Sequence, residues 1–145
     1  MKNNKFRIIR ADWSLQSSEL KKIREIVFIK EQKVPKEEEW DGEDEKSWHY
    51  LAITKNEEHV GCARLMPTGQ IGRMAVLKDF RGQGIGALIL ENVISHTAEL
   101  GLPNVFLHAQ TYAIGFYVKA GFEAYGEEFM DANIPHFAMK LQSDN

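Results

Sequence analysis

Residues 80–90 read FRGQGIGALIL, in which three glycines alternate with other residues behind Arg81 and an apolar run follows at once. Between a strand and a long helix, such a loop leaves backbone N–H groups free at the helix N-terminus, where the helix dipole favours an anion. Glycines lack a Cβ, so a phosphate can approach the main chain closely, and Arg81 adds a positive charge. The alternative is an ordinary turn in which Gly82 or Gly84 only supplies a positive φ, and a glycine motif alone does not decide between the two.

Two nucleotide-binding motifs can be compared with this loop. A P-loop requires a Lys followed by Ser or Thr, and no such pair follows these glycines. The spacing Gly82-x-Gly84-x-x-Ala87 does satisfy the dinucleotide pattern, which also expects a carboxylate at the end of the next strand to hold the ribose. That segment ends in LHAQ, with Gln110 and no acidic residue, and the segments before the loop read as a hairpin meander. A dinucleotide site is therefore disfavoured.

The composition is that of an ordinary soluble domain, and we expect residues 1–145 to form a single one. The net charge of −3 argues against nucleic acid as the main partner. The chain shows no secretory leader and no apolar run of the roughly 18 residues that suggest a membrane span. Cys62 is the sole cysteine, which fits a reducing compartment, and we expect a buried, inert thiol in a cytoplasmic protein.

Hydrophobic periodicity predicts alternating elements of both kinds. An acidic stretch, residues 34–47, carries seven carboxylates between Glu37 and Glu45 and is too polar to be a core element. The predicted strands are 5–11, 48–55, 59–67, 69–77, 104–110 and 136–142, and the predicted helices are 17–32 (with a Ser cap), 84–101 and 113–122 (ended by Gly121). Antiparallel strands come first, and a parallel crossover follows, so the fold class is α+β with one mixed, mostly antiparallel central sheet flanked by helices.

The chain resembles the GCN5-related N-acetyltransferases (GNAT). Their cofactor motif, [RQ]-x-x-G-x-[GA] after a strand, is matched fully by Arg81 to Gly86, and FYVKAGF at residues 116–122 is similar to a second hallmark, a helix with a Tyr shortly before Gly-Phe. VFIKEQKVP, GCARLMP and NIPHFAM further resemble the ElaA-like branch. One departure is Gln110, which stands where many members carry an Asn.

The resemblance implies acetyl-CoA as cosubstrate, with no metal, and a GNAT fold. The pyrophosphate would lie on the main chain of the glycine loop, and the pantetheine arm would pair with the preceding strand like an added strand. The cofactor-binding residues so implied are Met74, Ala75, Val76, Arg81, Gly82, Gln83, Gly84, Ile85, Gly86, Gln110, Phe116 and Tyr117.

Direct transfer to an amine needs a base for the amine and an acid for the departing thiolate. The resemblance assigns the acid to Tyr117, although an aromatic residue in this helix could equally be a packing residue. The base stays open among His108, Glu31 at the end of the first helix, His136 in NIPHF, and a water chain, and Glu31 could instead contact the acceptor.

The remaining charged residues allow two interpretations. Arg64 and Arg73 could bind an acidic group of the acceptor, but internal ion pairs are favoured because an Arg in a sheet normally needs a carboxylate partner. The acidic stretch could attract cationic amines, but such a run is more often a solvated loop. No histidines or cysteines stand at the spacing of a metal site.

The function expected from the sequence is therefore acetyl transfer from acetyl-CoA to a primary amine of a small molecule. The alternative is an acyl-CoA-binding sensor or interaction module that has lost catalysis, and a generic nucleotide binder is a distant third. No nucleic-acid or membrane partner is expected, and the oligomeric state is open, with a homodimer among the options.

Overall fold

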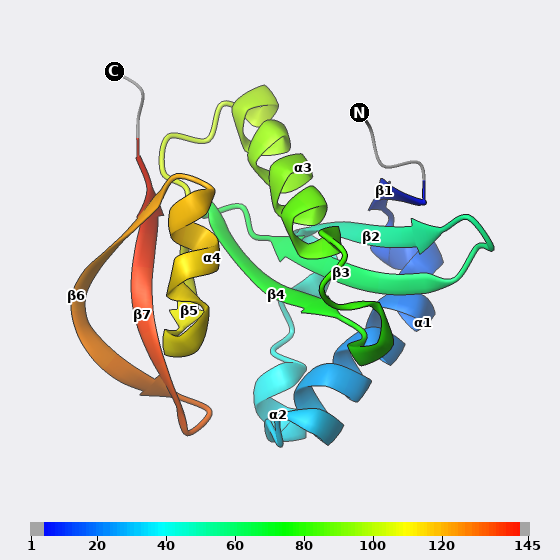
Figure 1. The fold of residues 1–145 in the computed structure, drawn as a ribbon, viewed down its shortest axis with the longest axis horizontal. Coiled ribbons are helices and arrows are strands. Elements are labelled where there is room, and N and C mark those ends of the chain that lie inside the picture. Colours follow the sequence, from blue (N-terminus) through cyan, green and yellow to red (C-terminus); the bar gives the residue numbers. More distant parts are fainter. Residues whose placement is uncertain (1–4, 143–145) are drawn as a thin grey trace.

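A seven-stranded mixed sheet organises the chain, as the computed structural model of residues 5–142 shows (Figure 1). The strands lie in the order β1-β2-β3-β4-β5-β7-β6, and every neighbouring pair is antiparallel except β4 and β5. They span β1 Phe6–Ala11, β2 Trp48–Thr54, β3 His59–Leu65, β4 Gln70–Val76, β5 Phe106–Gln110, β6 Phe122–Asp131 and β7 Ile134–Leu141. The predicted α+β class and the mixed, mostly antiparallel sheet are confirmed.

Helical segments cover both faces of this sheet. They are α1 Trp13–Arg24, the π-helix η1 Glu25–Glu31, α2 Lys36–Glu39, α3 Ile85–Leu100, α4 Ile114–Lys119 and three short 3₁₀ turns, η2 Asp44–Lys46, η3 Lys78–Phe80 and η4 Thr111–Ala113. Helix α1 packs on one face of β2, β3 and β4, whereas α3 packs on the other. No helix in the described range is both long and apolar enough to cross a membrane.

The alternation of side chains along β2 divides the core in two. Tyr50 and Ala52 face α3 and join the larger apolar cluster, which includes Ile89 and extends to β5 and β7. Leu51 and Ile53 face the opposite side and pack with α1 residues such as Ile23. Helices thus bury both faces of the sheet. A ligand-binding site is therefore expected at the ends of the central strands.

Two predicted elements differ from the structure. The first helix begins at Trp13, because Asp12 accepts a hydrogen bond from the Ser14 N–H at 2.9 Å and caps it, so the predicted Ser cap is wrong. The strand β6 has no counterpart in the sequence prediction, which has a single strand after the last helix. Its pattern is hidden because only Phe122 is buried along its length and two adjacent carboxylates interrupt it.

Candidate active site

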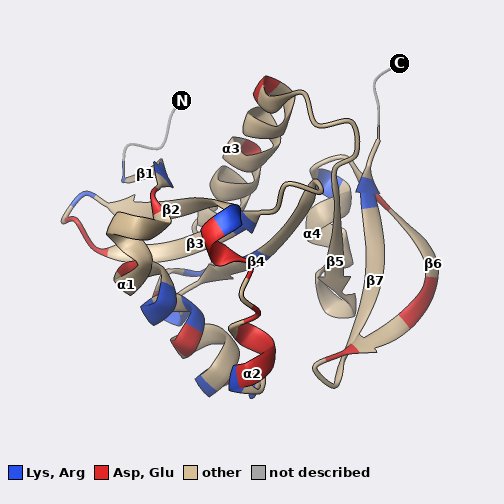
Figure 2. Cartoon of the chain, turned by 180° about the vertical axis from the view of Figure 1, so that it is seen from behind, with Lys and Arg blue, Asp and Glu red and all other residues tan. Residues whose placement is uncertain are grey.

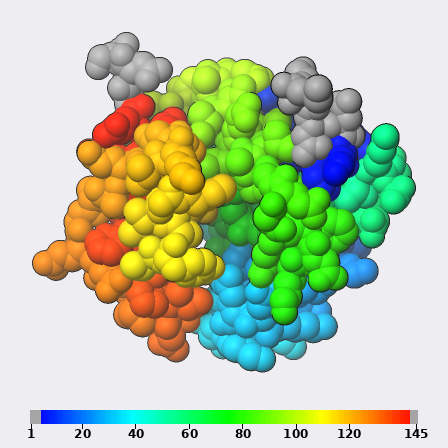
Figure 3. Space-filling view, viewed as in Figure 1, coloured from blue at the N-terminus to red at the C-terminus, as the bar shows by residue number. Residues whose placement is uncertain are grey.

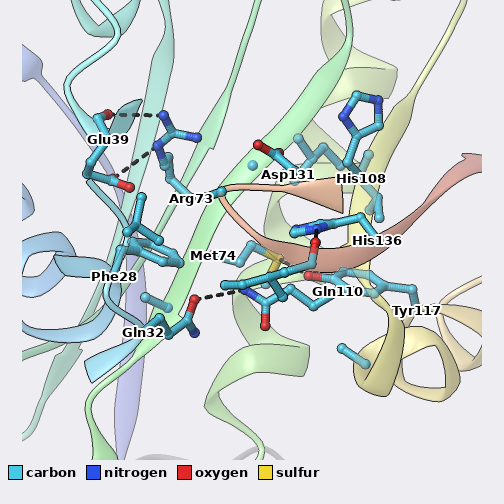
Figure 4. Close-up of a pocket in the computed structure, with 18 of the residues that line it drawn as sticks. Phe28, Gln32, Glu39, Arg73, Met74, His108, Gln110, Tyr117, Asp131 and His136 are labelled. Atoms are coloured by element: carbon cyan, nitrogen blue, oxygen red, sulfur yellow. Dashed lines mark hydrogen bonds and ion pairs between the residues drawn. The ribbon is translucent and has the colours of Figure 1, made fainter. Parts of the chain in front are cut away.

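A pocket opens where β4 and β5 separate. The two parallel strands pair only at Gln70–Phe106 and Ile71–Leu107, after which they diverge. The opening is a cavity of about 320 Å³, lined by β4, β5, η1, α2, α4 and the β6–β7 turn. Figure 3 shows the surface hollowed between α4 and the green segment around residues 77–86, and Figure 4 shows the lining side chains.

The glycine loop lies at the entry to α3, as the sequence predicts. Gly82 and Gly84 have φ of +80° and +84°, and a Cβ at either position would meet only open space. Gly84 is the N-cap of α3 and has no side chain to accept from the first turn, so the N–H groups of that turn remain as donors. The side chain of Ile85 is buried, at 1% exposure, so only its main chain can contribute to a ligand site at this loop. The geometry fits a phosphate group on the backbone.

Arg81 is held by two partners. Its Nη1 and Nη2 donate to Glu31 at 2.7 and 2.8 Å, and its Nε donates to the Val76 carbonyl at 2.8 Å. The hydrogen bond from Arg81 lowers the pKa of Glu31, which stays ionised. Glu31 therefore lies beside the glycine loop, to which Arg81 binds it. It does not line the pocket.

Strand β4 is distorted along the pocket. Arg64 pairs with Gly72 and Cys62 pairs with Ala75, so Arg73 and Met74 together lie opposite one residue of β3. Arg73 takes a φ of +52°, which is uncommon for a non-glycine residue. From Met74 in this bulge onward, Met74, Ala75 and Val76 line the pocket on the side that faces away from β3, where no strand pairs with them.

Tyr117 projects from α4 onto this open edge. Among residues 5–142, its hydroxyl donates only to the Met74 Sδ at 3.8 Å, a weak acceptor, and burial raises the pKa of Tyr117 to about 12. The hydroxyl therefore keeps its proton at neutral pH. Phe116 packs edge-on against Tyr117 and also approaches Gly86, where a Cβ would lie 3.4 Å from its Cζ. The two aromatic side chains and Gly86 share one wall of the pocket.

Two histidines line the pocket from β5 and β7 (Figure 4). His108 on β5 is exposed in the pocket, and desolvation lowers its pKa below 6.5 despite the nearby Asp131. His136 on β7 is 8% exposed, stacks on Phe129 and has its Nδ1 at 2.7 Å from the Ile134 carbonyl oxygen. His108 is thus free to face a ligand, whereas His136 is largely a packing residue.

One polar contact across the pocket has no counterpart in the sequence analysis. The Gln110 Nε2 donates to the Gln32 Oε1 at 2.8 Å and joins the end of β5 to the end of η1. Gln32 follows a π-helix, a form that often occurs at functional sites. The residues VFIKEQ carry no signal that distinguishes a π-helix from an α-helix, so Gln32 could not be found from the sequence.

The acidic stretch forms a buried ion-pair network beside the pocket. Arg24, 1% exposed, donates from Nε to Glu39 at 2.8 Å and from Nη1 to Asp44 at 2.7 Å. Arg64 binds Asp41 through two hydrogen bonds of 2.9 Å and binds Asp44 at 3.1 Å. The expectation that the acidic stretch is too polar for the core is therefore wrong for Glu39 and Asp44, which are 2% and 7% exposed.

Arg73 completes the network from β4. Its Nε lies 3.0 Å from the Glu39 Oε2, and its Nη2 donates to Asp41 at 3.2 Å and to the carbonyls of Glu38 and Glu39. The expected ion pairs of Arg64 and Arg73 are confirmed. Desolvation by burial raises the pKa of Asp41, but the hydrogen bonds from Arg64 and the Glu43 N–H, with the charges of Arg64 and Arg73, outweigh it and hold that pKa down to about 2.

Other reactive groups are inert or dispersed. Burial raises the pKa of the Cys62 thiol to about 12, so it is not a nucleophile at neutral pH. Among residues 5–142, no three side chains of His, Cys, Asp or Glu come together as metal ligands.

A family model described as an acetyltransferase (GNAT) domain matches residues 17–143. The chain belongs to the GNAT acetyltransferase family. It is 40% identical over 121 residues to an uncharacterised N-acetyltransferase of Bacillus subtilis, YjcF, covering 81% of this chain and 86% of the relative. The GNAT fold places the open edge of β4 beneath the glycine loop, and the chain is an N-acetyltransferase by family.

Solved GNAT structures superpose on nearly the whole chain. An acyl-CoA N-acyltransferase from Pseudomonas aeruginosa has a TM-score of 0.82 at 30% identity, covering 94% of this chain and 98% of that one. Escherichia coli ElaA has a TM-score of 0.84 at 25% identity, covering 94% and 99%. The expected likeness to ElaA is therefore found.

Proposed function

We propose that this GNAT protein transfers an acetyl group from acetyl-CoA directly to a primary amine of a small molecule, with Tyr117 as general acid. The observation that carries the proposal is the Tyr117 hydroxyl, which has only a thioether partner and lies on the unpaired edge of β4. A phenol that merely packs would bury its hydroxyl against a strong acceptor. Here the hydroxyl is left for a ligand.

The cosubstrate site fits the residues present. The main-chain N–H groups of Gly82 to Gly86 would hold the pyrophosphate, and the edge of Met74 to Val76 that faces away from β3 would hold the pantetheine arm. Arg81 acts there mainly through its link between Val76 and Glu31, since its charge is already matched. Phe116 and Gln110 would flank the arm, and Gln83 the phosphates. Acetyl-CoA supplies the activated acetyl thioester when bound.

His108 is the base that the structure favours. An alkylamine of pKa about 10.4 is mostly protonated at pH 7, and removing its proton costs about 4–5 kcal/mol without help. A lowered pKa keeps His108 neutral at pH 7, and its ring is exposed in the pocket. Glu31 is a weaker candidate because its carboxylate is in an ion pair outside the pocket lining, and His136 because it is nearly buried. A chain of water molecules that leads to His108 would carry the amine proton equally well.

Tyr117 would donate to the sulfur as it departs. A proton transfer from a hydroxyl of pKa about 12 to a thiolate of about 8.5 is uphill by about 5 kcal/mol. The thiolate would form in the same apolar wall, where desolvation raises its proton affinity too and narrows that gap. The hydroxyl therefore acts as the charge develops, by a hydrogen bond that strengthens into proton transfer.

Thiol release from acetyl-CoA in the presence of a panel of primary amines tests this function, with product mass as confirmation. We expect thiol release to depend on the amine and on Tyr117. A CoA ester should also raise the melting temperature. Binding without transfer across a broad panel would instead favour the acyl-CoA sensor, and no shift in melting temperature would remove the cosubstrate site altogether.

A further inference from the structure

The charges around the pocket point to the kind of amine it accepts. Arg73 is the one Lys or Arg among the described residues that line it. The positive charge of its guanidinium is matched by the carboxylates of Glu39 and Asp41, and its Nη2 also donates to two main-chain carbonyls, although its Nε has no hydrogen-bond partner among residues 5–142. A carboxylate on the acceptor would therefore have to compete with two carboxylates already paired with this cation.

The network behind Arg73 is balanced within itself. Three guanidiniums, those of Arg24, Arg64 and Arg73, face three carboxylates, those of Glu39, Asp41 and Asp44. Two other carboxylates line the pocket, Glu38 on α2 and Asp131 at the end of β6, and both are exposed.

Glu38 and Asp131 are not compensated. Neither side chain has an ion-pair partner within 4.0 Å among residues 5–142. Glu38 and Asp131 lie on different walls of the pocket. Figure 2 shows acidic residues, in red, on both α2 and β6. Asp131 also acts electrostatically on His108, so this uncompensated charge is felt at the proposed base.

The reacting nitrogen cannot neutralise these carboxylates, because an amine must be uncharged to attack a thioester. A second positive charge on the acceptor can. Between the polar groups, Phe28, Val34 and Ile134 give the pocket apolar wall that suits methylene groups.

We propose that the acceptor is an aliphatic diamine or polyamine, whose reacting amino group faces His108 while a second ammonium group is held by Glu38 and Asp131 on the opposing walls of the pocket. This inference rests on the proposed acetyl transfer. The reacting amine loses one proton to His108, its nitrogen forms a C–N bond with the acetyl carbonyl carbon, the C–S bond of the thioester breaks, and the sulfur leaves with a proton from Tyr117, so the distal ammonium group keeps its charge throughout.

Three matched acceptors test the inference: pentylamine, 1,5-diaminopentane and 6-aminohexanoate, in which the fifth carbon of the aliphatic chain carries a hydrogen atom, an ammonium group or a carboxylate group. We expect kcat/KM to be about tenfold higher for the diamine than for pentylamine, beyond the statistical factor for two amines, and lowest for the amino acid. The preference should shrink as salt is added.

Charge-neutral variants locate the effect. In Glu38→Gln and in Asp131→Asn, the ratio of kcat/KM for the diamine over pentylamine should fall by several-fold, roughly the loss of one partly screened ion pair. The ratio cancels any change at His108, because both acceptors meet the same base. Glu37→Gln is the matched control: it removes an exposed carboxylate from the same helix, outside the pocket lining, and should leave the ratio as it is.

Calorimetry with the CoA-bound protein separates this inference from the proposed function. Diamine binding that exceeds pentylamine binding and weakens in the two variants supports the charge arrangement even if turnover is slow. Equal use of pentylamine and the diamine, or a preference for 6-aminohexanoate, overturns the inference and leaves acetyl transfer standing. Silence toward all three amines, with no diamine binding, overturns the inference, whereas the proposed acetyl transfer is overturned only by silence across the broad amine panel.

Discussion

Replacing Tyr117 by phenylalanine removes one hydroxyl and little else. The phenyl ring keeps its contacts with Phe116 and Phe122, whose ring centroids lie 5.0 and 6.2 Å away. The lost hydrogen bond runs to a sulfur at 3.8 Å, so the free energy of unfolding should fall by less than about 1 kcal/mol. Loss of a general acid, by contrast, costs about 10²–10⁴ in rate, or roughly 3–5 kcal/mol of transition-state stabilisation.

The assay is thiol release at saturating amine, with kcat and the KM for acetyl-CoA measured separately. In Tyr117→Phe we expect kcat to fall by that factor and the KM to change little, because the proposed cosubstrate contacts are main-chain ones. Tyr125→Phe is the control, since Tyr125 is 45% exposed on β6 and outside the pocket lining. A kcat near that of the wild type in a folded variant would show that Tyr117 is not the acid.

Three further outcomes follow from the geometry. Gly86→Ala should stabilise α3 by up to about 1 kcal/mol through helix propensity, yet weaken CoA binding by calorimetry, because the new Cβ enters the cosubstrate wall; unchanged affinity would contradict the glycine-loop site. Glu39→Gln should lower the free energy of unfolding in urea by about 3 kcal/mol, since it leaves buried guanidiniums short of one charge, whereas Glu37→Gln should have almost no effect; equal losses would refute the network argument. The pH dependence of kcat tests His108, measured with an acceptor amine that is unprotonated over the pH range used. We expect kcat to be independent of pH around pH 7 and to fall as the pH drops through the lowered pKa of His108. His108→Gln should be slower and should not show this fall at low pH, and a fall that persists in the variant would exclude His108 as the base.

The main-chain part of the site could be predicted from the sequence. The glycines indicate the proposed phosphate-binding loop, because positive φ and close approach restrict the residue type at Gly82 and Gly84. The order of strands and helices around it follows from hydrophobic periodicity. The assignment of Tyr117 came from the resemblance, since an aromatic residue by itself does not distinguish packing from catalysis.

The side-chain part could not be predicted in the same way. Glu39 and Asp44 read as solvated residues because their partners, Arg24 and Arg64, are remote in the sequence and meet them only after folding. Three arginines within apolar segments, opposite one acidic stretch, were the available signal. The strand β6 was missed because an edge strand with one buried side chain has almost no alternation to detect.

On the short helix α2, the neighbouring residues Glu38 and Glu39 differ in how freely they can be substituted. Glu39 is fixed by two arginines, so exchange there threatens the fold, while Glu38 is held through its main chain, whose N–H donates to the Pro35 carbonyl and whose oxygen accepts from Arg73. A change of side chain at residue 38 therefore keeps the helix anchored and alters only what the pocket meets. Directed libraries that aim at new acceptors can start at residue 38 and on the facing turn at residue 131, and should leave residue 39 untouched.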